Sequence, residues 1–327
     1  MITPSSRLLS RIVSIALLFL LLLFPALSVQ GAAGGLLLWF NIVLPTLSPF
    51  MICTQMVVSL GGTNLLIRPV YPILHALFGL SPSGTFVLFC GMLCGYPLGA
   101  KMCADFLLQG KISRTEASYL LSICNHPSPM FLLGYCMGQL KMAVSPGVLL
   151  TCLYLPLLPL SILSRRFYDF RPRRTAGSLR LFACGGSPTD GDTIDSGSAS
   201  LPPSMEEVLL STAETMVIIG GYIMLFSILA VWILQIRGLP PVLSACLNGA
   251  AEITTGIHRL CTVLPPQKAV FPVIAAVAFG GFSGIFQTKS VIKNAGLSIR
   301  HYLFWKIIHT LLACGIFILL SVLLPLS

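Results

Sequence analysis

The stretch VLFCGMLCGYPLGAK, residues 87–101, is an apolar run that Gly95 and Pro97 interrupt and that ends at Lys101. Proline removes a backbone donor from a helix, and glycine allows the backbone to leave the helical conformation. Within a membrane, non-helical backbone survives only where it is buried in protein or lines a cavity. If the surrounding chain lies in a membrane, this stretch predicts a broken or re-entrant helix.

The composition of the chain places it in a membrane. Of the 327 residues, 55% are hydrophobic and 9% are charged, and the mean hydropathy is +0.91. A soluble domain typically has about 25% charged residues. Since a spanning helix needs roughly 20 apolar residues, the length allows about seven to nine membrane segments. We therefore expect an all-α, polytopic integral membrane protein that contains re-entrant or broken helices.

Charge and composition divide the chain into four parts. Arg7 and Arg11 precede the first apolar run, which predicts an uncleaved signal-anchor span over residues 1–34 with a cytoplasmic N-terminus in the cell membrane. Residues 164–207 contain six arginines and a Gly/Ser/Pro/Asp-rich second half, and we expect a disordered cytoplasmic linker there. The linker separates two membrane halves, residues 35–163 and 208–327.

The second apolar segment, from about Gly35 to Leu60, contains Pro45 and Pro49. Two prolines predict a kinked or broken helix. In the second membrane half, the stretch Leu243–Ile257 is too short and too polar for a span that faces lipid. We expect this stretch to be another broken or re-entrant piece.

A shift of 185 residues brings the two halves into register. Gly95–Gly99 then falls on Gly280–Gly284, and Ser113 falls on Ser298. Paired, glycine-interrupted segments in corresponding halves are typical of transporter binding sites. The pattern indicates a two-fold internal repeat.

Three groups of residues are candidates for solute binding, because their polar atoms lie in or beside apolar segments. We interpret the carboxylate of Glu252 as the strongest single candidate, since a carboxylate inside a membrane segment is costly. Gln287, beyond the glycines of the second half, can complete the site. The candidate residues are Gly95, Tyr96, Pro97, Gly99, Lys101 and Asp105; Asn125 and Ser128; and Glu252, Thr254, Thr255, Gly280, Ser283, Gly284 and Gln287.

Each group also has a structural interpretation. Gly95 and Gly99 can form a helix-packing face, and Lys101 and Asp105 a structural ion pair at i, i+4. The prolines around Asn125 and Ser128 can produce a simple kink. Glu252 can pair with Arg259 or with a helix N-terminus.

Signals for catalysis and for metals are absent from the sequence. The chain has no Walker loop, no GxSxG motif, no HExxH motif and no dinucleotide fingerprint. We expect no enzyme activity, no cofactor and no metal site. We expect membrane lipid and an unidentified small polar solute as partners, expect no nucleic acid, and leave a homo-oligomer open.

Taken in order, the motifs resemble one known family. Gly95–Lys101, Gly110–Ser113, Asn125 and Ser128–Phe131, followed by Glu252–Gly256, Phe279–Ser283 and Gln287, resemble the YlbJ family of sporulation integral membrane proteins. That family contains the nucleoside-recognition (Gate) domain, and it has a polar pair such as Asn-Asn where this chain has Asn125-His126. The resemblance covers the chain from about Leu38 onward, excluding the linker.

The resemblance implies a membrane protein needed for spore development and for the spore cortex. It also implies a distant similarity to the Gate regions of concentrative nucleoside transporters, without making nucleosides the substrate. We expect a transporter-like protein that moves a nucleoside, a cell-wall precursor or an ion. The alternative is a non-transporting scaffold for cortex assembly that uses its Arg-rich linker as a contact surface.

Overall fold

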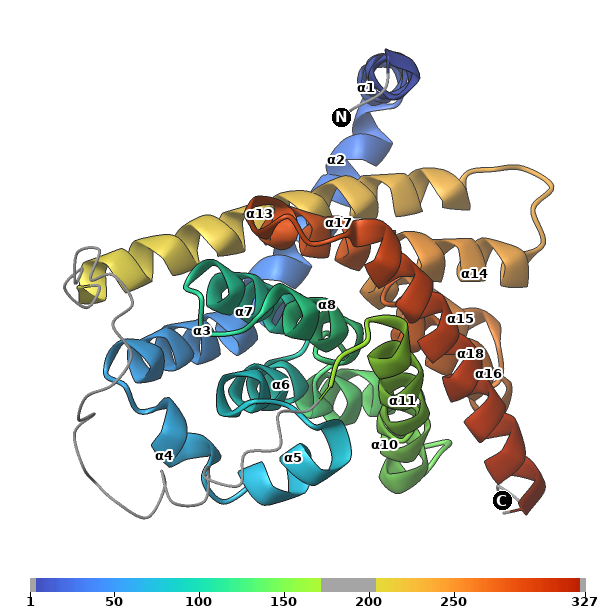
Figure 1. Cartoon of the computed structure of the whole chain (residues 1–327). Coiled ribbons are helices and arrows are strands. Elements are labelled where there is room, and N and C mark those ends of the chain that lie inside the picture. The colour runs from blue at the N-terminus through green and yellow to red at the C-terminus, as the bar shows by residue number, and fades with distance from the viewer. Residues whose placement is uncertain (1–3, 172–203, 324–327) are drawn as a thin grey trace, which may run out of the picture.

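The protein is helical throughout the part of the chain that the structure describes. The computed structural model describes residues 4–171 and 204–323, and every regular element within these ranges is a helix (Figure 1). The helices before residue 172 are α1 (Pro4–Leu23), α2 (Pro25–Leu38), the π-helical η1 (Trp39–Val43), α3 (Leu44–Ser59), α4 (Thr63–Ile67), α5 (Tyr71–Phe78), α6 (Pro82–Cys94), α7 (Leu98–Leu108), α8 (Arg114–Ile123), the π-helical η2 (Phe131–Cys136), α9 (Met137–Gln139), α10 (Pro146–Tyr154) and α11 (Leu157–Phe167). The helices from residue 204 onward are α13 (Met205–Leu234), α14 (Pro241–Ala251), α15 (Ile253–Val263), α16 (Pro266–Phe279), α17 (Gly281–Ile292), the 3-10 helix η3 (Lys293–Ala295) and α18 (Ile299–Leu323).

Local sequence signals explain where many of these helices begin. Ser81, Ser113, Ser145 and Ser204 each adopt an extended conformation, and each side chain accepts a hydrogen bond from the backbone N–H three residues later. Such a serine satisfies one of the unpaired amides of the first helical turn. Serine caps therefore fix the starts of α6, α8, α10 and α13.

Within residues 4–171 and 204–323, five helical stretches are long and apolar enough to cross a membrane. A sixth is present if α5 and α6, which meet at 97°, form one broken span. The five stretches are Pro25–Ser59, Pro146–Phe167, Met205–Leu234, Pro266–Ala295 and Ile299–Leu323. The number is below the predicted seven to nine because other apolar segments form shorter helices, such as α14 and α15 with 11 residues each.

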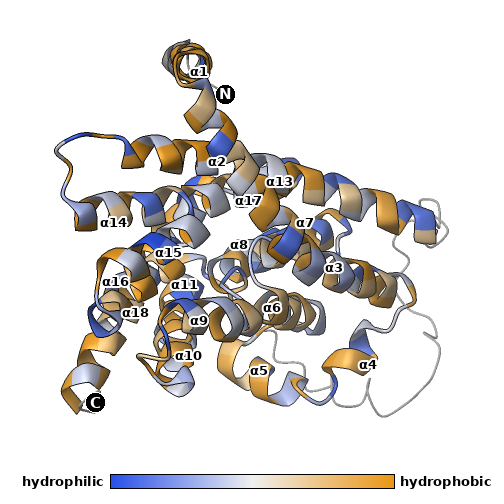
Figure 2. Ribbon diagram, turned by 180° about the vertical axis from the view of Figure 1, so that it is seen from behind, coloured by the Kyte–Doolittle hydropathy of each residue, from blue (hydrophilic) through white to orange (hydrophobic). Residues whose placement is uncertain are grey.

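The outer faces of the long helices are apolar. Leu210, Val217, Leu311 and Val322 are all more than 60% exposed, and hydrophobic residues cover most of α3, α13 and the C-terminal part of α18 (Figure 2). Exposing apolar surfaces of this extent to water is unfavourable, whereas the hydrocarbon core of a membrane solvates them. The all-helical membrane class predicted from composition is thus confirmed.

The N-terminal region differs in detail from the prediction. The predicted span over residues 1–34 comprises α1 and most of α2, which are divided at Phe24, and α1 projects away from the other helices (Figure 1). The domain boundary after residue 34 stays a prediction. The segment with Pro45 and Pro49 is not broken, since α2, η1 and α3 form one continuous stretch. The π-helical turn η1 lies directly before Pro45, and a π-turn is one of the ways in which a helix accommodates a local irregularity.

The predicted linker lies mostly outside the described residues. Ser164–Phe167 belong to α11, and Met205–Glu207 belong to α13, which begins with a capping box between Ser204 and Glu207. Helix therefore extends past both predicted boundaries of the segment 164–207. The disorder and the cytoplasmic location expected for this segment stay predictions.

Four of the helix breaks in the described chain lie at the motifs that the sequence singles out. The α6–α7 break lies at Gly95, the α14–α15 break at Glu252 and the α16–α17 break at Gly280, while residues 124–128 separate α8 from the helical segment that contains η2. All four coincide with stretches in which the sequence predicts broken or unwound backbone. They arise where glycine, proline or a capping carboxylate ends the helical hydrogen-bond ladder.

The elements recur at the 185-residue shift. The shift moves Cys94, the last residue of α6, onto Phe279, the last residue of α16. Gly95 and Gly280, which follow them, have φ of +82° and +80°. Ser113 and Ser298 each accept a hydrogen bond from the N–H three residues later, before α8 and α18. The α6–α8 unit thus has a counterpart in α16–α18, and α7 packs against α17 between them.

Candidate functional site

The turn between α6 and α7 brings two helices of the first half into close contact. Gly95 has a φ of +82°, a conformation that side chains rarely adopt, and the Tyr96–Pro97 peptide bond is cis. Gly91 and Gly99 face each other across the turn, and a Cβ on either would collide with the carbonyl oxygen of Cys124. Their lack of side chains allows α6, α7 and the end of α8 to meet.

Glu252 forms the tip of the corresponding α14–α15 hairpin in the second half. It is 2% exposed and is the N-cap of α15. Its carboxylate accepts hydrogen bonds from the backbone N–H groups of Thr254 and Thr255, at 3.2 and 2.8 Å, and from both threonine hydroxyl groups. The N-terminal end of a helix attracts a negative charge. The structure therefore gives Glu252 the helix-terminus role rather than a partnership with Arg259.

The α16–α17 break lies against the tip of the first-half hairpin. Gly280 and Gly281 both have positive φ, at +80° and +67°. The positions that Cβ atoms would occupy on Gly280 and Gly284 lie 3.8–3.9 Å from the Tyr96 ring. One turn further along, Gln287 donates a hydrogen bond of 3.0 Å to the hydroxyl group of Ser283. Gly280 and Gly284 thus face the Tyr96 ring of the other half.

A pocket lies between these breaks, and we call it the central pocket. Its cavity volume is about 90 Å³. Residues of η1 and α3 form one wall, and residues of both halves form the others. The lining consists of Leu38, Ile42, Val43, Thr46, Leu47, Cys94, Gly95, Tyr96, Pro127, Ser128, Phe131, Ile223, Glu252, Ile253, Thr254, Gly280, Ser283, Gly284 and Gln287.

The central pocket continues into a wider apolar groove. The groove has a volume of about 410 Å³ and shares Thr46, Cys94 and Ser128, among others, with the pocket. Typical ligand sites measure about 300–1,000 Å³. The central pocket alone is below that range, whereas pocket and groove together reach it.

Nine of the fifteen candidate residues line the central pocket. They are Gly95, Tyr96, Ser128, Glu252, Thr254, Gly280, Ser283, Gly284 and Gln287. Their role in binding a solute stays a prediction. Pro97, Gly99, Lys101, Asp105, Asn125 and Thr255 do not line it.

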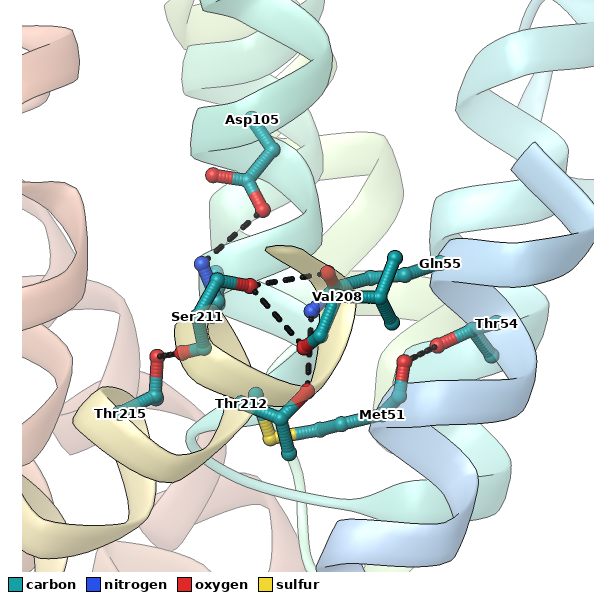
Figure 3. A network of polar contacts seen from close by, with 9 residues as sticks. Met51, Thr54, Gln55, Asp105, Val208, Ser211, Thr212 and Thr215 are labelled. Atoms are coloured by element: carbon teal, nitrogen blue, oxygen red, sulfur yellow. Dashed lines mark hydrogen bonds and ion pairs between the residues drawn. The ribbon is translucent and has the colours of Figure 1, made fainter. Parts of the chain in front are cut away.

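Lys101 and Asp105 form the i, i+4 ion pair that the sequence offers as the structural interpretation. The Nζ–Oδ2 distance is 3.2 Å, and both side chains are partly exposed. Figure 3 shows Asp105 together with a polar network in which Ser211 of α13 donates to Gln55 of α3 at 3.0 Å. The Gln55 amide in turn donates to Thr212 at 3.5 Å. These contacts join α13 to α3 outside the pocket.

Asn125 connects the two halves instead of lining the pocket. Its Oδ1 accepts from the backbone N–H of Ala100 at 3.4 Å, and its Nδ2 donates to the hydroxyl groups of Thr288 and Tyr302, both at 2.9 Å. The side chain is 1% exposed. A buried amide with these partners holds α7, α17 and α18 together.

The unwound backbone after α8 has its own partners. The carbonyl of Pro127 accepts a hydrogen bond of 2.7 Å from the hydroxyl of Tyr154. The hydroxyl of Ser128 accepts one of 3.2 Å from the N–H of Phe131, so it caps the next helical segment. The tyrosine and the serine replace contacts that the broken helix lost, which is the condition for such backbone at membrane depth.

Sequence reasoning missed two contributions. The apolar wall from η1 and α3 carries no polar signal, although a π-helical turn often lies at a functional site. Lys306 and His309 of α18 are both buried, and the Nζ of Lys306 lies over the ring of Tyr96. An ionisable residue within a long apolar helix is the signal that could have identified them. Among the described residues, no three His, Cys, Asp or Glu side chains gather closely enough to hold a metal ion.

The fold and the pocket define the class of the protein: a polytopic α-helical integral membrane protein with broken helices that meet around a pocket. The chain is similar to one curated protein of this class. It is 26% identical over 324 residues to the sporulation integral membrane protein YlbJ of Bacillus subtilis strain 168, an alignment that covers 90% of this chain and 78% of that protein. No family model matches the chain, and no solved structure matches it. The resemblance to the YlbJ family that the motifs predict is confirmed by this similarity.

Proposed function

We propose that this protein is a transporter-like sporulation protein that moves a small polar solute across the cell membrane during formation of the spore cortex. The central pocket and its adjoining groove are the solute pathway. The solute is a nucleoside, a cell-wall precursor or an ion. The N-terminus is on the cytoplasmic side, and the broken helices constitute a Gate-like domain.

One observation carries this proposal. The central pocket is built by helix breaks from both halves, with the α6–α7 turn, the α14–α15 tip and the α16–α17 junction all on its surface. Discontinuous helices of this kind expose backbone amides and carbonyls that can bind a solute inside a membrane protein. A protein that only recruits partners through its surface needs no such convergence of broken backbone.

The polar groups on the pocket wall suit a small, hydrogen-bonding solute. Ser283 and Gln287 bond to each other, and both can exchange that bond for one to a solute. The Glu252 carboxylate is occupied by its own helix, so we assign it to shaping and polarising the wall and not to gripping the solute alone. The apolar residues of η1 and α3 cover the opposite side.

Tyr96→Phe is the sharpest test of the pocket. The ring of Tyr96 lines the pocket, while its hydroxyl is buried and has no hydrogen-bond partner among the described residues. Removing an unpartnered buried hydroxyl is expected to leave the thermal stability in detergent unchanged or to raise it. If the hydroxyl contacts the solute, the same variant loses transport. Loss of transport without loss of stability cannot come from damaged folding.

Transport is measured in proteoliposomes with labelled uridine, a labelled nucleotide-sugar precursor of the cell wall, and sodium ions. The spore yield of a Bacillus subtilis strain that lacks its YlbJ relative and carries the variant gene gives the cellular readout. We expect uptake of one solute and a reduction of at least tenfold in Tyr96→Phe. A negative result with every solute, together with normal sporulation of Tyr96→Phe, would overturn the proposal.

A scaffold function gives the opposite pattern. If the protein only positions cortex-forming partners, deletion of residues 172–203 abolishes sporulation and Glu252→Gln leaves it intact. Glu116→Gln is the matched control for Glu252→Gln. Glu116 is also buried, at 6% exposure, and accepts a hydrogen bond of 2.8 Å from the N–H of Ser81, but it lies outside the central pocket. Transport predicts that only Glu252→Gln impairs uptake.

A further inference from the structure

A buried basic cluster lies on the side of Tyr96 that faces away from the central pocket. Lys306 of α18 is its first member. Lys306 is 2% exposed, and its Nζ donates to the carbonyl of Ala278 at 3.4 Å. The Nζ lies 5.4 Å from the ring centre of Tyr96 and 5.9 Å from that of Tyr302. Among the described residues, Lys306 forms no ion pair with a carboxylate. A buried lysine without a counter-ion is costly to keep charged.

Two buried histidines accompany this lysine. The rings of His126 and His309 are 4.3 Å apart between centres, and their exposures are 2% and 0%. The Nε2 of His309 lies 2.9 Å from the carbonyl oxygen of Leu153. Since a carbonyl can only accept, this nitrogen carries a proton, and the Nδ1 of the neutral ring is a free acceptor. That Nδ1 and both ring nitrogens of His126 form no hydrogen bond of good geometry with the described residues, although the backbone of Ala278 faces His309 and that of Ser122 faces His126.

Lys306, His126 and His309 cannot all be charged at once. When all three are neutral, their nitrogens form few hydrogen bonds. Three positive charges in one buried cluster repel one another, and Lys306 lies within electrostatic reach of both imidazoles. When all are neutral, three buried ring nitrogens lack a hydrogen bond of good geometry, which is unusual in a packed protein. One added proton gives a buried nitrogen a donor that it can share with a neighbouring base. It does not bring two positive charges together. Interacting bases of this kind titrate as a group.

The other titratable groups around the cluster leave its net charge positive or zero. Cys124, two residues before His126, and Tyr302 on α18 face the lysine. Tyr96 comes from the α6–α7 turn and Tyr154 from α10, and both are neutral phenols. The nearest carboxylate in this set is Glu252, which interacts with Tyr96 on the pocket side. Tyr96 is thus the layer between the basic cluster and the central pocket.

We propose that Lys306, His126 and His309 bind one exchangeable proton, and that its binding and release change the position of Tyr96 at the central pocket. The proton moves between water and one of three nitrogen bases, and no other bond is made or broken. This proposal rests on the proposed transport function and names its coupling ion, a proton.

Proton binding is tested on the purified protein without any solute. Histidines labelled with ¹³C at Cε1 report the charge of each of the five rings by NMR between pH 5 and 9. In the wild type, we expect at most one of His126 and His309 to become charged in this range. In Lys306→Met, an imidazole takes over the proton, and we expect its titration midpoint to rise by at least one pH unit, which is a tenfold gain in proton affinity.

Lys289→Met is the matched control. The Nζ of Lys289 also lies over an aromatic ring, that of Phe286 at 5.5 Å, but the side chain is exposed. This variant is expected to reproduce the wild-type titration. Independent charging of both rings, or identical titrations in the wild type and in Lys306→Met, would overturn the proposal. The wild-type titration decides the first point even if Lys306→Met does not fold.

The link to the pocket is tested with Cys94, which lines the pocket, as the only cysteine of the chain. A variant with only the exposed Cys246 gives the intrinsic pH dependence of mixed-disulfide formation with a charged methanethiosulfonate, which releases methanesulfinate. We expect the Cys94 rate, normalised to that of Cys246, to change at least threefold between pH 6 and 8. The change should vanish in Lys306→Met. A normalised rate that is constant with pH, or that keeps its change in that variant, refutes the coupling.

The outcomes separate this inference from the proposed function. Neither measurement uses a solute, so a proteoliposome screen that is negative for every solute removes the transport function and leaves the proton site standing. Conversely, solute uptake that is independent of a pH gradient, with unchanged histidine titrations in Lys306→Met, removes the proton site and leaves transport standing.

Discussion

At the scale of single residues, Gly99 shows how a candidate binding residue becomes a packing residue. The sequence offers both interpretations for it, and the structure places it against Gly91 and the carbonyl of Cys124, away from the central pocket. The absence of a side chain is what matters at this position. Backbone groups of α6, α7 and α8 can then approach one another.

Gly99→Ala is therefore expected to destabilise the protein by about 1–3 kcal/mol, because the new methyl group forces backbone atoms apart. Gly221→Ala in α13 is the control, because a Cβ there meets nothing within 4 Å. Alanine in an open helical position is expected to stabilise by about 0.5–1 kcal/mol. Thermal unfolding in detergent measures both, and equal stabilities of the two variants would contradict the close packing at Gly99.

At the scale of elements, the α14–α15 hairpin depends on one carboxylate. Glu252 satisfies two backbone amides at the start of α15 and lies at the helix end that favours negative charge. The close contact between Gly249 and Gly256 lets the two helices fold back on each other just beyond this tip. The Glu252 cap and the Gly249–Gly256 contact together produce the helical hairpin.

Glu252→Gln is expected to lower the stability by about 1–2 kcal/mol, because the amide keeps an acceptor oxygen but loses the charge at the helix end. Glu252→Ala should cost more, since it leaves buried amides without a partner. Hydrogen exchange at the amides of Thr254 and Thr255 localises the effect. Protection of these amides that is unchanged in Glu252→Ala would show that the cap is dispensable.

At the scale of the whole molecule, the two halves are joined through buried polar contacts. Asn125 of the first half bonds to Thr288 and Tyr302 of the second. At the surface, Arg114 donates to the carbonyl of Gly296 at 2.6 Å. These contacts cross more than 160 residues of chain and fix how the broken helices meet.

Asn125→Leu is expected to destabilise the protein by about 2 kcal/mol, because it removes hydrogen bonds between three helices. The variant should also couple with Thr288→Val. In a double-mutant cycle of unfolding free energies in detergent, we expect an interaction energy of about 0.5–3 kcal/mol. Additive effects would show that Asn125 and Thr288 do not interact across the halves.

The sequence by itself determined the class of the protein and the places where its helices break. Composition requires a membrane, and glycine, proline and serine act through the backbone of their own turn, so Gly95, Gly280 and the serine caps could be read locally. The family resemblance also came from these motifs in their order. Exact ends were harder, because packing decides whether a helix continues, as it does through Pro45 and past residue 163.

Only the tertiary structure decided which polar side chains face the central pocket. Asn125 and Ser128 lie three residues apart in one unwound stretch, yet the first joins α7, α17 and α18 while the second lines the pocket. Lys306 and His309 meet His126 across more than 170 residues of sequence, and no local pattern reports such a contact. The physical reason is that a helix break follows from local backbone chemistry, whereas the surroundings of a side chain depend on how distant helices pack.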